Sequence, residues 1–498
     1  MKTYSKMLLL IITTIAIIFI INFYKKVYSL PSGPFPLPLI GNLYLFNLKK
    51  MHLWIEDQKK KYGSVFTIFV PTPFVVLGDV DAIKEAYIEN GDNFIGRNTT
   101  GYPEKLYTKK ENVGVIFSEG DWWRDQRRLS ISIMRDFGMG KGIMEEKIKL
   151  VINDMFSYID NLKEKNSVDI PHIIQLTVGN VINGIVFGFS YKYDDAENFF
   201  KFTDLVEQFV ATFKSLRFTL FILFPEIDNI PIFNTFLTRP LTNITRKIHE
   251  LNRANIEKCK KSYSPHDEPP NFVHALMKQL ESKEIKTLNL DDDHLEGMVL
   301  DFFIAGMETT FTTLKYFILY LINDTKIQDR LRSEIDHIVG KDGDIKLLHK
   351  NDMVLVSSFI HEAQRFAGIL GFPLARKCTN DTYIKGNLIK KDTLVIPFDR
   401  LANHDERYFE DPFTFKADRF VNKDGKGLNK DLLEKFVPFG IGKRICAGKS
   451  LAEAELFLIL TSLLQRYKFT PNGPVNMEVE FGSILSPKPY TCKIEKRN

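Results

Sequence analysis

The amino-acid sequence predicts a mainly α-helical fold with small β-sheets, preceded by one N-terminal transmembrane helix. Apolar residues recur at helical spacing over most of the chain. Runs of β-branched and aromatic residues that suit strands occur in only two short stretches, near residues 64–77 and 374–396. An almost unbroken apolar run, residues 7–23, opens the chain.

The composition indicates a globular protein with one large folded domain. Of the 498 residues, 44% are hydrophobic and 26% are charged, so the chain can bury a large core. No Pro/Gly/Ser-rich linker and no repeat interrupts residues 43–498, which we expect to form a single domain. The net charge of +5 is spread over mixed-sign segments, which argues against a nucleic-acid partner. Four widely spaced cysteines fit a reducing compartment better than a disulfide scaffold.

Residues 1–24 are predicted to be a membrane anchor. The apolar run has the length of a short membrane span. A cleaved signal peptide is the alternative, but Lys25 and Lys26 follow the run instead of a small-residue cleavage site. Positive charge directly after the span favours a cytosolic position for the rest of the chain, although Lys2 and Lys6 weaken the asymmetry.

Residues 25–42 are predicted to be a basic and proline-rich hinge. Their prolines disfavour a helix or a central strand and predict a stiff, extended connector. A ligand for an SH3-type domain is the alternative interpretation. Between an anchor and a globular body, a spacer that orients the body on the membrane explains the composition better.

The expected elements of the body follow the hydrophobic period along the chain. Residues 64–77 carry β-branched and aromatic residues around a Pro-Thr-Pro turn and predict a hairpin. A second small patch of strand is predicted around residues 374–396. Helices are predicted over residues 120–135, 143–164, 170–187, 195–218, 246–261, 291–323, 326–339 and 447–467.

The most informative stretch places Cys446 in a glycine-punctuated loop at the start of the predicted helix 447–467. A thiolate is a metal ligand, and the pKa of a thiol falls beside a cation or a helix N-terminus. Arg444 is placed to meet a carboxylate, such as a porphyrin propionate. Gly448 has no Cβ, so a flat cofactor can approach the backbone there. A lone cysteine is more often a small buried apolar residue, so the interpretation depends on the whole motif.

This run resembles the haem-binding loop of the cytochrome P450 superfamily, of the eukaryotic microsomal type. The resemblance implies the large α-rich fold of that family over residues 43–498, as a haem-thiolate catalytic domain. It implies haem b (iron protoporphyrin IX) as the cofactor, with Cys446 as the axial ligand of the iron. It also implies that Phe439, Arg444 and Gly448 contact the haem.

The motif Ala-Gly-Met-Glu-Thr-Thr lies inside the predicted helix 291–323. Thr309 comes four residues after Ala305, so its hydroxyl can bond the Ala305 carbonyl and bend the helix. A groove beside Gly306 is expected to admit dioxygen and water. An ordinary kinked core helix with a solvated Glu308 is the alternative. The motif resembles the acid–threonine pair of the family, which implies that Glu308 and Thr309 are catalytic and supply protons for oxygen activation.

Trp123 and Arg127 are predicted at i and i+4 on one face of the helix 120–135, where both can donate to one anion. The spacing resembles the Trp-x-x-x-Arg pair of the family, which implies that both side chains bind a haem propionate. Arg376 lies in the first strand after the helix that carries Glu362. It corresponds to a further propionate partner in many members of the family.

Glu362 and Arg365 are three residues apart on one helix face and can form an ion pair. An exposed salt bridge of about 0–1 kcal/mol is the alternative. The segment around Arg419 resembles the family's partner segment, which implies a buried triad of Glu362, Arg365 and Arg419 that supports the haem loop. Ala417 and Asp418 stand where proline and glutamate are usual in the family.

The resemblance covers residues 31–493 and implies a monooxygenase that inserts one oxygen atom from O2 into a lipophilic small molecule. The chain shows no Gly-x-Gly-x-x-Gly at a strand–helix turn, so NADPH-cytochrome P450 reductase is the expected electron donor, with cytochrome b5 as an additional candidate. We expect a single-pass protein of the endoplasmic reticulum membrane, in contact with lipid, whose catalytic domain faces the cytosol.

Two other classes of function remain open from the sequence. Some haem-thiolate relatives are isomerases or dehydratases that act without a reductase, and such members often lack the acid–threonine pair. A non-enzymatic haem sensor is disfavoured by the same pair and by the anchor. The segments expected to contact substrate are rich in Phe, Leu and Ile, which supports a lipophilic ligand and no narrower class; they are residues 97–117, 200–224, 366–374 and 481–485.

Overall fold

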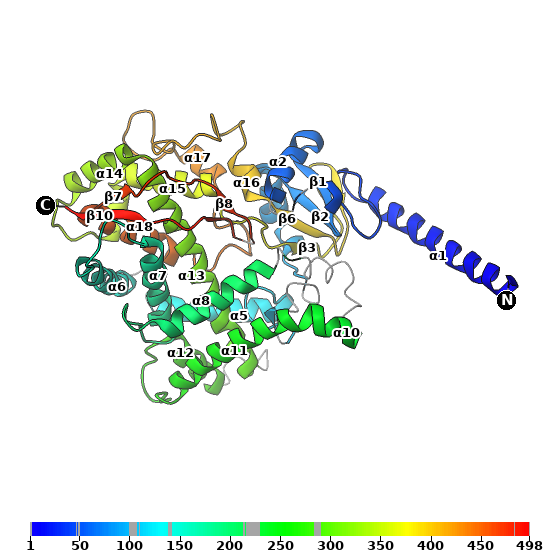
Figure 1. Cartoon of the computed structure of the whole chain (residues 1–498), viewed down its shortest axis with the longest axis horizontal. Coiled ribbons are helices and arrows are strands. Elements are labelled where there is room, and N and C mark those ends of the chain that lie inside the picture. The colour runs from blue at the N-terminus through cyan, green and yellow to red at the C-terminus, as the bar shows by residue number, and fades with distance from the viewer. Residues whose placement is uncertain are drawn as a thin grey trace.

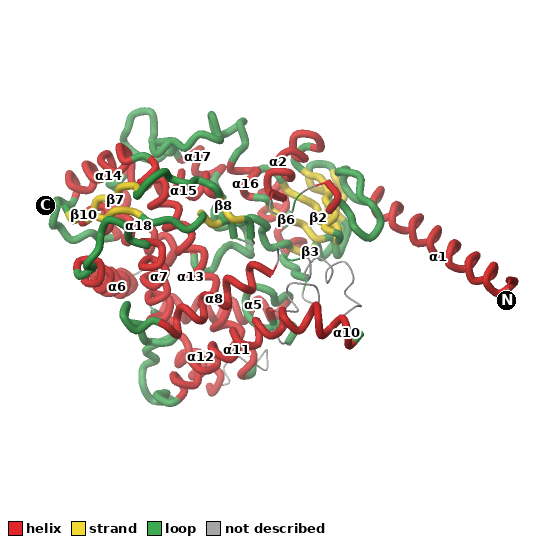
Figure 2. The backbone as a smooth tube through the Cα atoms, viewed as in Figure 1, coloured by secondary structure: helices red, strands yellow, loops and turns green. Residues whose placement is uncertain are grey.

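Helices form most of the molecule, and the strands gather in a few small sheets (Figures 1 and 2). The predicted mainly α-helical fold class is therefore confirmed. The computed structural model describes residues 2–45, 47, 50–98, 107, 108, 110–137, 142–212, 215, 230–282, 290–482 and 484–497.

The helices of the described residues begin and end, in chain order, as follows: α1 (Lys2–Tyr28), α2 (Met51–Tyr62), α3 (Val80–Lys84), α5 (Gly120–Asp136), α6 (Gly142–Asp160), α7 (Ile170–Val186), α8 (Glu197–Thr212), α10 (Pro231–Phe233), α11 (Arg239–Lys260), α12 (Phe272–Ser282), α13 (Asp292–Asn323), α14 (Thr325–Ile338), α15 (Val354–Ala367), α16 (Asp399–Asn403), α17 (Lys430–Lys435) and α18 (Lys449–Arg466). Short 3₁₀ or π turns lie at η1 (Leu43–Leu45), η3 (Glu85–Glu89), η4 (Gly91–Phe94), η6 (Asn234–Thr238) and η7 (Leu347–Asn351).

The helices predicted from hydrophobic period match α5, α6, α7, α13, α14 and α18 to within a few residues. α11 begins at Arg239 rather than at residue 246, and α2 and α12 were not predicted. α8 ends at Thr212, whereas the prediction extended to residue 218; residues 213, 214 and 216–218 of that prediction lie outside the described residues.

The strands are short, as the following bounds show: β1 (Val65–Val70), β2 (Thr72–Leu77), β3 (Arg376–Lys377), β4 (Thr382–Ile384), β5 (Asn387–Ile389), β6 (Leu394–Pro397), β7 (Tyr467–Pro471), β8 (Val479–Glu480), β9 (Ser486–Pro487) and β10 (Cys492–Lys496). The largest sheet has the order β1-β2-β6-β3, and the other sheets pair β10 with β7, β4 with β5, and β8 with β9.

The largest sheet joins the two strand-rich stretches of the sequence. The predicted hairpin is confirmed, because β1 pairs antiparallel with β2 and Val65 lies opposite Leu77. β6 then pairs parallel with β2, with Phe74 opposite Leu394, and β3 pairs antiparallel with β6. This pairing places Arg376, in β3, at the edge of the sheet opposite β1.

α13 is a 32-residue helix that runs through the main hydrophobic core. It packs against α7, α11, α15 and α18, and apolar side chains on every side of its C-terminal half are buried. A helix that is apolar on all sides belongs in the interior rather than at a surface. The polar residues near its middle are therefore exceptions that need a physical explanation.

α1 extends away from the body of the molecule (Figure 1). Its apolar part, Tyr4–Tyr28, is the one helix of the described residues that is long and apolar enough to cross a membrane, and none of its most apolar window is buried. The predicted boundary at residue 24 falls inside this helix, which continues to Tyr28. Phe23 and Tyr24 contact Phe69 and Phe35 of the body, with ring centroids 5.9 and 5.4 Å apart.

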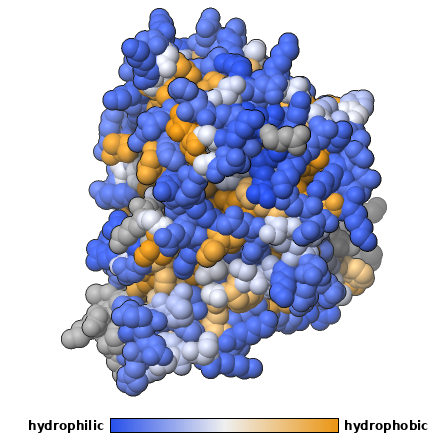
Figure 3. Space-filling view, turned by 90° about the vertical axis from the view of Figure 1, so that its left-hand side faces the viewer, coloured by the Kyte–Doolittle hydropathy of each residue, from blue (hydrophilic) through white to orange (hydrophobic). Residues whose placement is uncertain are grey.

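The proline-rich hinge is attached to β1 by several hydrogen bonds. The Thr67 N–H donates to the Ser32 carbonyl at 3.0 Å, and the Phe69 N–H donates to the Asn42 side chain at 2.7 Å. The hinge therefore holds α1 in a fixed position next to the sheet. The face of the molecule turned away from α1 is mostly hydrophilic, with hydrophobic side chains in small separate areas (Figure 3).

Deleting residues 2–22 should release the protein from membranes without lowering its thermal unfolding midpoint. The reason is that the side chains of residues 4–22 are exposed, whereas the contacts with the body described above begin at Phe23 and Tyr24. Membrane sedimentation and thermal unfolding measure the two effects. A longer deletion to residue 30 is the control, and it should lower the midpoint. An equal loss of stability in the shorter deletion would contradict the assignment.

Candidate functional site

The Cys446 loop connects α17 to α18, and a set of 3.0 Å backbone hydrogen bonds fixes its shape. The N–H groups of three residues donate to carbonyls within the loop: Gly440 to Val437, Ile445 to Gly442, and Cys446 to Phe439. Gly442 has a φ of 75°, and a Cβ there would collide with the Tyr87 carbonyl, so glycine is required. The side chain of Phe439 is half-buried.

Cys446 is the one exposed cysteine among the described residues. Burial by the surrounding protein nevertheless raises the pKa of the thiol. The N–H groups of Gly448 and Lys449 and the charge of Arg127 lower this pKa by smaller amounts. The prediction of a lowered thiol pKa is thus wrong for the protein alone, because desolvation outweighs the helix N-terminus and the cation.

Ala305 of α13 is a second residue that is exposed although the helix around it is largely buried. It lies in the middle of the core helix and is nevertheless exposed, whereas Met307 beside it is fully buried. A Cβ added to Gly448 would meet no atom within 4 Å. At Gly306, Ile182 of α7 packs 3.1 Å from where a Cβ would stand, and the exposed residue is Ala305, one position earlier.

Arg444 is buried against an aromatic ring and several backbone carbonyls. Its guanidinium lies 4.0 Å from the centre of the Trp123 ring, which is a cation–π distance. Its Nη2 donates to the Ile95 carbonyl at 2.6 Å and to the Ser118 carbonyl at 2.7 Å. Arg444 thus connects the Cys446 loop to two segments far away in the sequence.

Arg127 and Arg376 approach the same loop from α5 and β3. The Arg127 Nη2 donates to the Ile445 carbonyl at 2.5 Å, and the Arg376 Nη2 donates to the Ile441 carbonyl at 3.0 Å. Arg376 also stacks on the Tyr87 ring at 3.5 Å. The structure therefore brings Trp123 and all three arginines predicted from the sequence to one place.

The guanidinium groups at this place form no ion pair with a described carboxylate. The nearest influences are the more distant charges of Glu119 on Arg444 and of Asp399 on Arg376. Burial, and after it the charges of Arg97, Arg376 and Arg127, hold the pKa of Arg444 well below its usual range. The Trp123 Nε1 is buried, and no described acceptor lies near it. An anion with several acceptor oxygens would satisfy all of these groups.

Thr309 and Glu308 lie on α13, about one turn after the exposed Ala305. The predicted hydrogen bond is present, because the Thr309 Oγ1 donates to the Ala305 carbonyl at 2.8 Å, and α13 continues without interruption through it. The Glu308 Oε1 is buried without a described partner, and burial raises the pKa of Glu308 to about 8. The nearby charge of Glu207 raises it further, while Lys315 opposes the shift. Glu308 therefore carries a proton at neutral pH.

Glu362, Arg365 and Arg419 meet in a buried ion triad. The Arg365 Nε donates to the Glu362 Oε2 at 2.6 Å and its Nη2 donates to the Oε1 at 2.9 Å. The Arg419 Nε lies 3.0 Å from both carboxylate oxygens. The side chains of Glu362 and Arg365 are completely buried, which rules out the exposed salt bridge considered from the sequence.

The two departures from the family pattern near Arg419 leave the triad intact. Ala417 is buried, and Asp418 points outward to pair with Arg330 of α14 at 2.8 Å. Phe420, next to Arg419, packs on Phe436 with ring centroids 5.4 Å apart, and Phe436 leads directly into the Cys446 loop. The packing of Phe420 on Phe436 thus connects the triad to that loop.

Two buried polar residues near the site were not recognised from the sequence. The Asp301 Oδ2 accepts from the Val115 N–H at 2.6 Å and from the Ile116 N–H at 2.9 Å, and burial raises its pKa to about 7. Arg97 donates to the Leu374 and Ala375 carbonyls at 3.2 and 2.6 Å. The sequence signal for Asp301 was a carboxylate inside an apolar helical run. No pattern in the sequence marked Arg97 as a residue of the site.

Comparison with known proteins agrees with this geometry. The family model described as cytochrome P450 matches residues 31–494. The chain is 33% identical over 470 residues to cytochrome P450 2H2 of Gallus gallus, covering 92% of each chain. It is 33% identical over 474 residues to cytochrome P450 2B15 of Rattus norvegicus, covering 93% of this chain and 92% of the relative. It is 29% identical over 503 residues to probable cytochrome P450 CYP36A1 of Caenorhabditis elegans, covering 98% of this chain and 99% of the relative.

The fold and the comparisons together define a haem-dependent monooxygenase. The chain belongs to the cytochrome P450 superfamily, and its relatives are of the microsomal type. The family implies a haem iron, and the residues present fit one: an accessible Cys446 thiol, a buried Trp123 Nε1 without a described partner, and guanidinium groups that form no ion pair with a described carboxylate.

Replacing Glu362 with glutamine should destabilise the protein strongly. Two guanidinium groups would then be buried without a charged partner, a loss of about 3–5 kcal/mol in the free energy of unfolding. Urea unfolding of the full chain measures it. Asp418→Asn is the control, since it removes an exposed ion pair worth at most about 1 kcal/mol. Equal losses in the two variants would contradict a structural role for the triad.

Proposed function

We propose that the chain is a haem-thiolate monooxygenase that inserts one oxygen atom from O2 into a lipophilic small molecule, using electrons from NADPH. The observation that carries this proposal is the pair of Glu308 and Thr309. A buried carboxyl that holds a proton at neutral pH stands next in sequence to a hydroxyl that is fixed on the carbonyl of the exposed Ala305. Oxygen activation consumes protons, whereas rearrangement and sensing need no such pair.

The proposed cofactor is haem b, which when bound supplies the iron at which dioxygen is reduced. Cys446 would ligate that iron, and the N–H groups of Gly448 and Lys449 together with Arg127 would stabilise its thiolate. Trp123, Arg127, Arg376 and Arg444 would bind the propionates, with Phe439 and Gly448 beside the ring. Glu362, Arg365 and Arg419 would hold the loop in place.

The proton route is proposed to run through Glu308 and Thr309. Because the Thr309 hydroxyl donates its proton to the Ala305 carbonyl, its lone pairs stay available to accept from water or from Glu308. The Thr309 oxygen would thereby be held in place as a hydrogen-bond acceptor, and Glu308 would supply the proton. Both groups act on the α13 side, opposite Cys446.

The remaining parts of the proposal concern the partners and the location. Electrons would come from NADPH-cytochrome P450 reductase, with cytochrome b5 as an additional donor. Residues 1–24 would anchor the chain in the endoplasmic reticulum membrane, residues 25–42 would be the hinge, and residues 43–498 would be the catalytic domain in the cytosol. The exposed apolar α1 and the basic Lys25 and Lys26 at its end support this orientation.

The substrate is proposed to be lipophilic because the described parts of the variable segments are aromatic. Phe117 packs on Tyr107 with ring centroids 5.3 Å apart, and Phe202 packs on Phe303 at 5.0 Å. The predicted substrate segments also include residues 99–106, 109, 213, 214, 216–224 and 483, which lie outside the described residues.

Replacing Thr309 with alanine should uncouple NADPH oxidation from product formation. In the presence of the reductase, NADPH should still be consumed, but more hydrogen peroxide and less product should form. Glu308→Gln should slow turnover instead. It should also remove the fall in wild-type rate above pH 8, where Glu308, whose pKa is about 8, loses its proton. NADPH, peroxide and product are measured together.

Thr313→Ala is the matched control, because the Thr313 hydroxyl makes the same type of bond, to the Thr309 carbonyl at 2.8 Å, one turn along α13. It should stay coupled. Fully coupled wild-type turnover in Thr309→Ala would contradict the proposed role. Conversion of a peroxide or an oxime without the reductase would support the isomerase or dehydratase class. A ligand-induced spectral shift with no turnover of any kind would support a sensor.

A further inference from the structure

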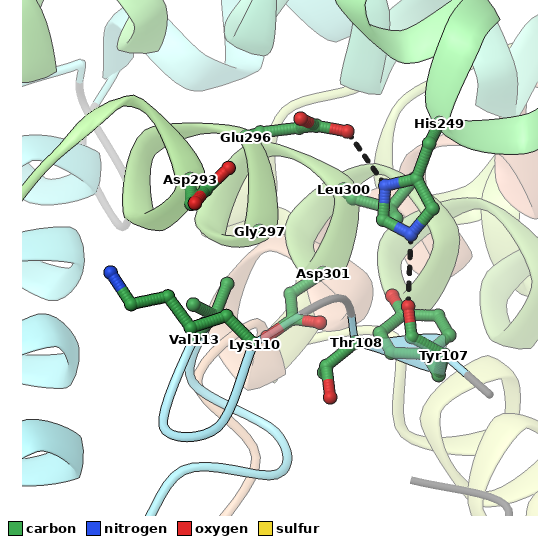
Figure 4. Close-up of a pocket in the computed structure, with 10 residues that line it drawn as sticks. All are labelled: Tyr107, Thr108, Lys110, Val113, His249, Asp293, Glu296, Gly297, Leu300 and Asp301. Carbon is green, nitrogen blue, oxygen red and sulfur yellow. Dashed lines mark hydrogen bonds and ion pairs between the residues drawn. The ribbon is translucent and has the colours of Figure 1, made fainter. Parts of the chain in front are cut away.

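Lys315 is a buried basic residue in the C-terminal half of the core helix α13. The residue is 9% exposed, and it forms no ion pair with a described carboxylate. Glu296, nearer the start of the same helix, differs in this respect, because its Oε1 lies 2.6 Å from the Nδ1 of His249 (Figure 4). A buried ammonium without an ion pair is costly, so it needs other partners.

The Lys315 side chain is bound to the chain near the C-terminus. Its Nζ donates to the Pro487 carbonyl oxygen at 2.6 Å and to the Ser486 Oγ at 3.1 Å, both in β9. The Tyr490 hydroxyl donates in turn to the Lys315 carbonyl at 2.7 Å. Residues 484–497, which include these partners, are described without a gap. Lys315 therefore anchors this stretch to α13 through both its side chain and its backbone.

The residues directly before this anchor join two of the segments that we predicted to contact substrate. The Leu485 N–H donates to the Ile369 carbonyl at 2.7 Å, and Ile484 forms an isolated antiparallel bridge with Leu370. Leu485 is buried and Ile484 is half-buried. The contacts of Lys315 with β9 therefore fix one end of a pairing that runs through the proposed ligand site.

Four acidic side chains act on the Lys315 ammonium from a longer distance. Burial lowers the pKa of Lys315, and these four groups oppose the shift. They come from several elements: Glu207 of α8, Glu480 of β8, Asp169 before α7 and Glu308 of α13 itself. The charge of Lys315 is thus balanced by its surroundings as a whole and by no single partner.

Glu308 lies on the same face of α13 as Lys315, because seven residues complete about two turns of an α-helix. The Lys315 Nζ lies 6.0 Å from the centre of the Phe311 ring, one turn nearer to Glu308. Burial, and after it the charge of Glu207, raise the pKa of Glu308 to about 8, and the charge of Lys315 opposes them. Lys315 therefore favours release of the Glu308 proton.

We propose that Lys315 is a positioning residue whose ammonium ties β9 to α13 and thereby sets where Ile484 and Leu485 stand in the ligand site. The proposal rests on the proposed function for the class of ligand, an apolar molecule bound near the haem. Without the tie, these two apolar side chains lose their fixed position, and a ligand has to order them when it binds. The charge of Lys315 adds a second effect, on the proton of Glu308.

Hydrogen exchange of the haem-loaded, full-length protein in detergent, read by mass spectrometry on peptides from residues 484–490, tests the anchor without turnover or a reductase. Lys315→Met keeps the side-chain stem and removes the ammonium. It should accelerate exchange of these peptides by roughly tenfold, the effect of losing one charged hydrogen bond. The dissociation constant of 4-phenylimidazole, read from its haem spectral shift, should rise in the same variant. Lys315→Arg, which keeps a cation with several donors, should restore most of the protection.

Lys488→Met is the matched control, because Lys488 adjoins Pro487 and its side chain forms an exposed pair with Glu478. It should exchange like the wild type. Wild-type exchange in a folded Lys315→Met would overturn the proposal. If that variant does not fold, Ser486→Ala decides, since it removes one of the two acceptors of the ammonium. Exchange should then be faster than in the wild type, and unchanged exchange would overturn the proposal.

The pH profile of reductase-supported turnover shows an effect that a purely structural anchor would not have. Lys315 lowers the pKa of Glu308, so Lys315→Met should move the fall in rate above pH 8 to higher pH. Glu207 raises the same pKa, so Glu207→Gln should move the fall to lower pH. Lys315→Arg should keep the wild-type profile. A profile that shifts in neither neutral variant would contradict the effect of Lys315 on Glu308.

The outcome can be separated from that of the proposed function. Loss of reductase-supported turnover in the wild type, with faster exchange in Lys315→Met, would contradict the monooxygenase proposal alone. Normal wild-type turnover with no effect of Lys315→Met on exchange would contradict the anchor alone.

Discussion

The site depends on one constraint: the guanidinium groups of Arg376 and Arg444 are buried beside the Cys446 loop, with the half-buried Arg127 next to them, and none of the three forms an ion pair with a described carboxylate. Arg444, Arg127 and Arg376 donate to carbonyls of segments that are far apart in the sequence, at Ile95, Ser118, Ile441 and Ile445. These bonds hold the segments together, but buried charges remain costly until an anion joins them. The haem would therefore complete the fold as well as supply the chemistry. An anion bound by these three arginines would also fix the chain segments to which the arginines donate.

Hydrophobic period was sufficient to predict most of the long helices of the body, because each of them buries its own apolar residues in the core. α13 shows this most clearly, since its observed bounds Asp292–Asn323 follow the predicted range almost residue for residue. The parallel pairing of β2 with β6 could not be predicted, because Phe74 and Leu394 lie in separate parts of the chain and no local pattern specifies their register. α2 and α12, of 12 and 11 residues, were too short to give a clear period.

The candidate site was predictable where its residues are close in sequence. Trp123 and Arg127, one turn apart, were found by spacing, and so was the Cys446 loop. Arg97, Asp301 and His249 were missed because their partners are distant; Arg97, for example, binds a carbonyl 277 residues away. The local helix N-terminus and cation each lower the pKa of the Cys446 thiol, but in the protein without a metal the surrounding tertiary structure desolvates the thiol and raises its pKa overall.

The central claim is that the internal space between α13 and the Cys446 loop holds a haem whose iron is bound by the Cys446 thiolate. The most direct measurement is the absorption spectrum of the reduced protein with carbon monoxide, compared between the wild type, Cys446→Ala and Cys378→Ala. Cys378 is a buried free thiol elsewhere in the chain and serves as the control. We predict that the red-shifted band of a thiolate-ligated ferrous haem is present in the wild type and in Cys378→Ala and absent in Cys446→Ala. Persistence of that band in Cys446→Ala would contradict the account.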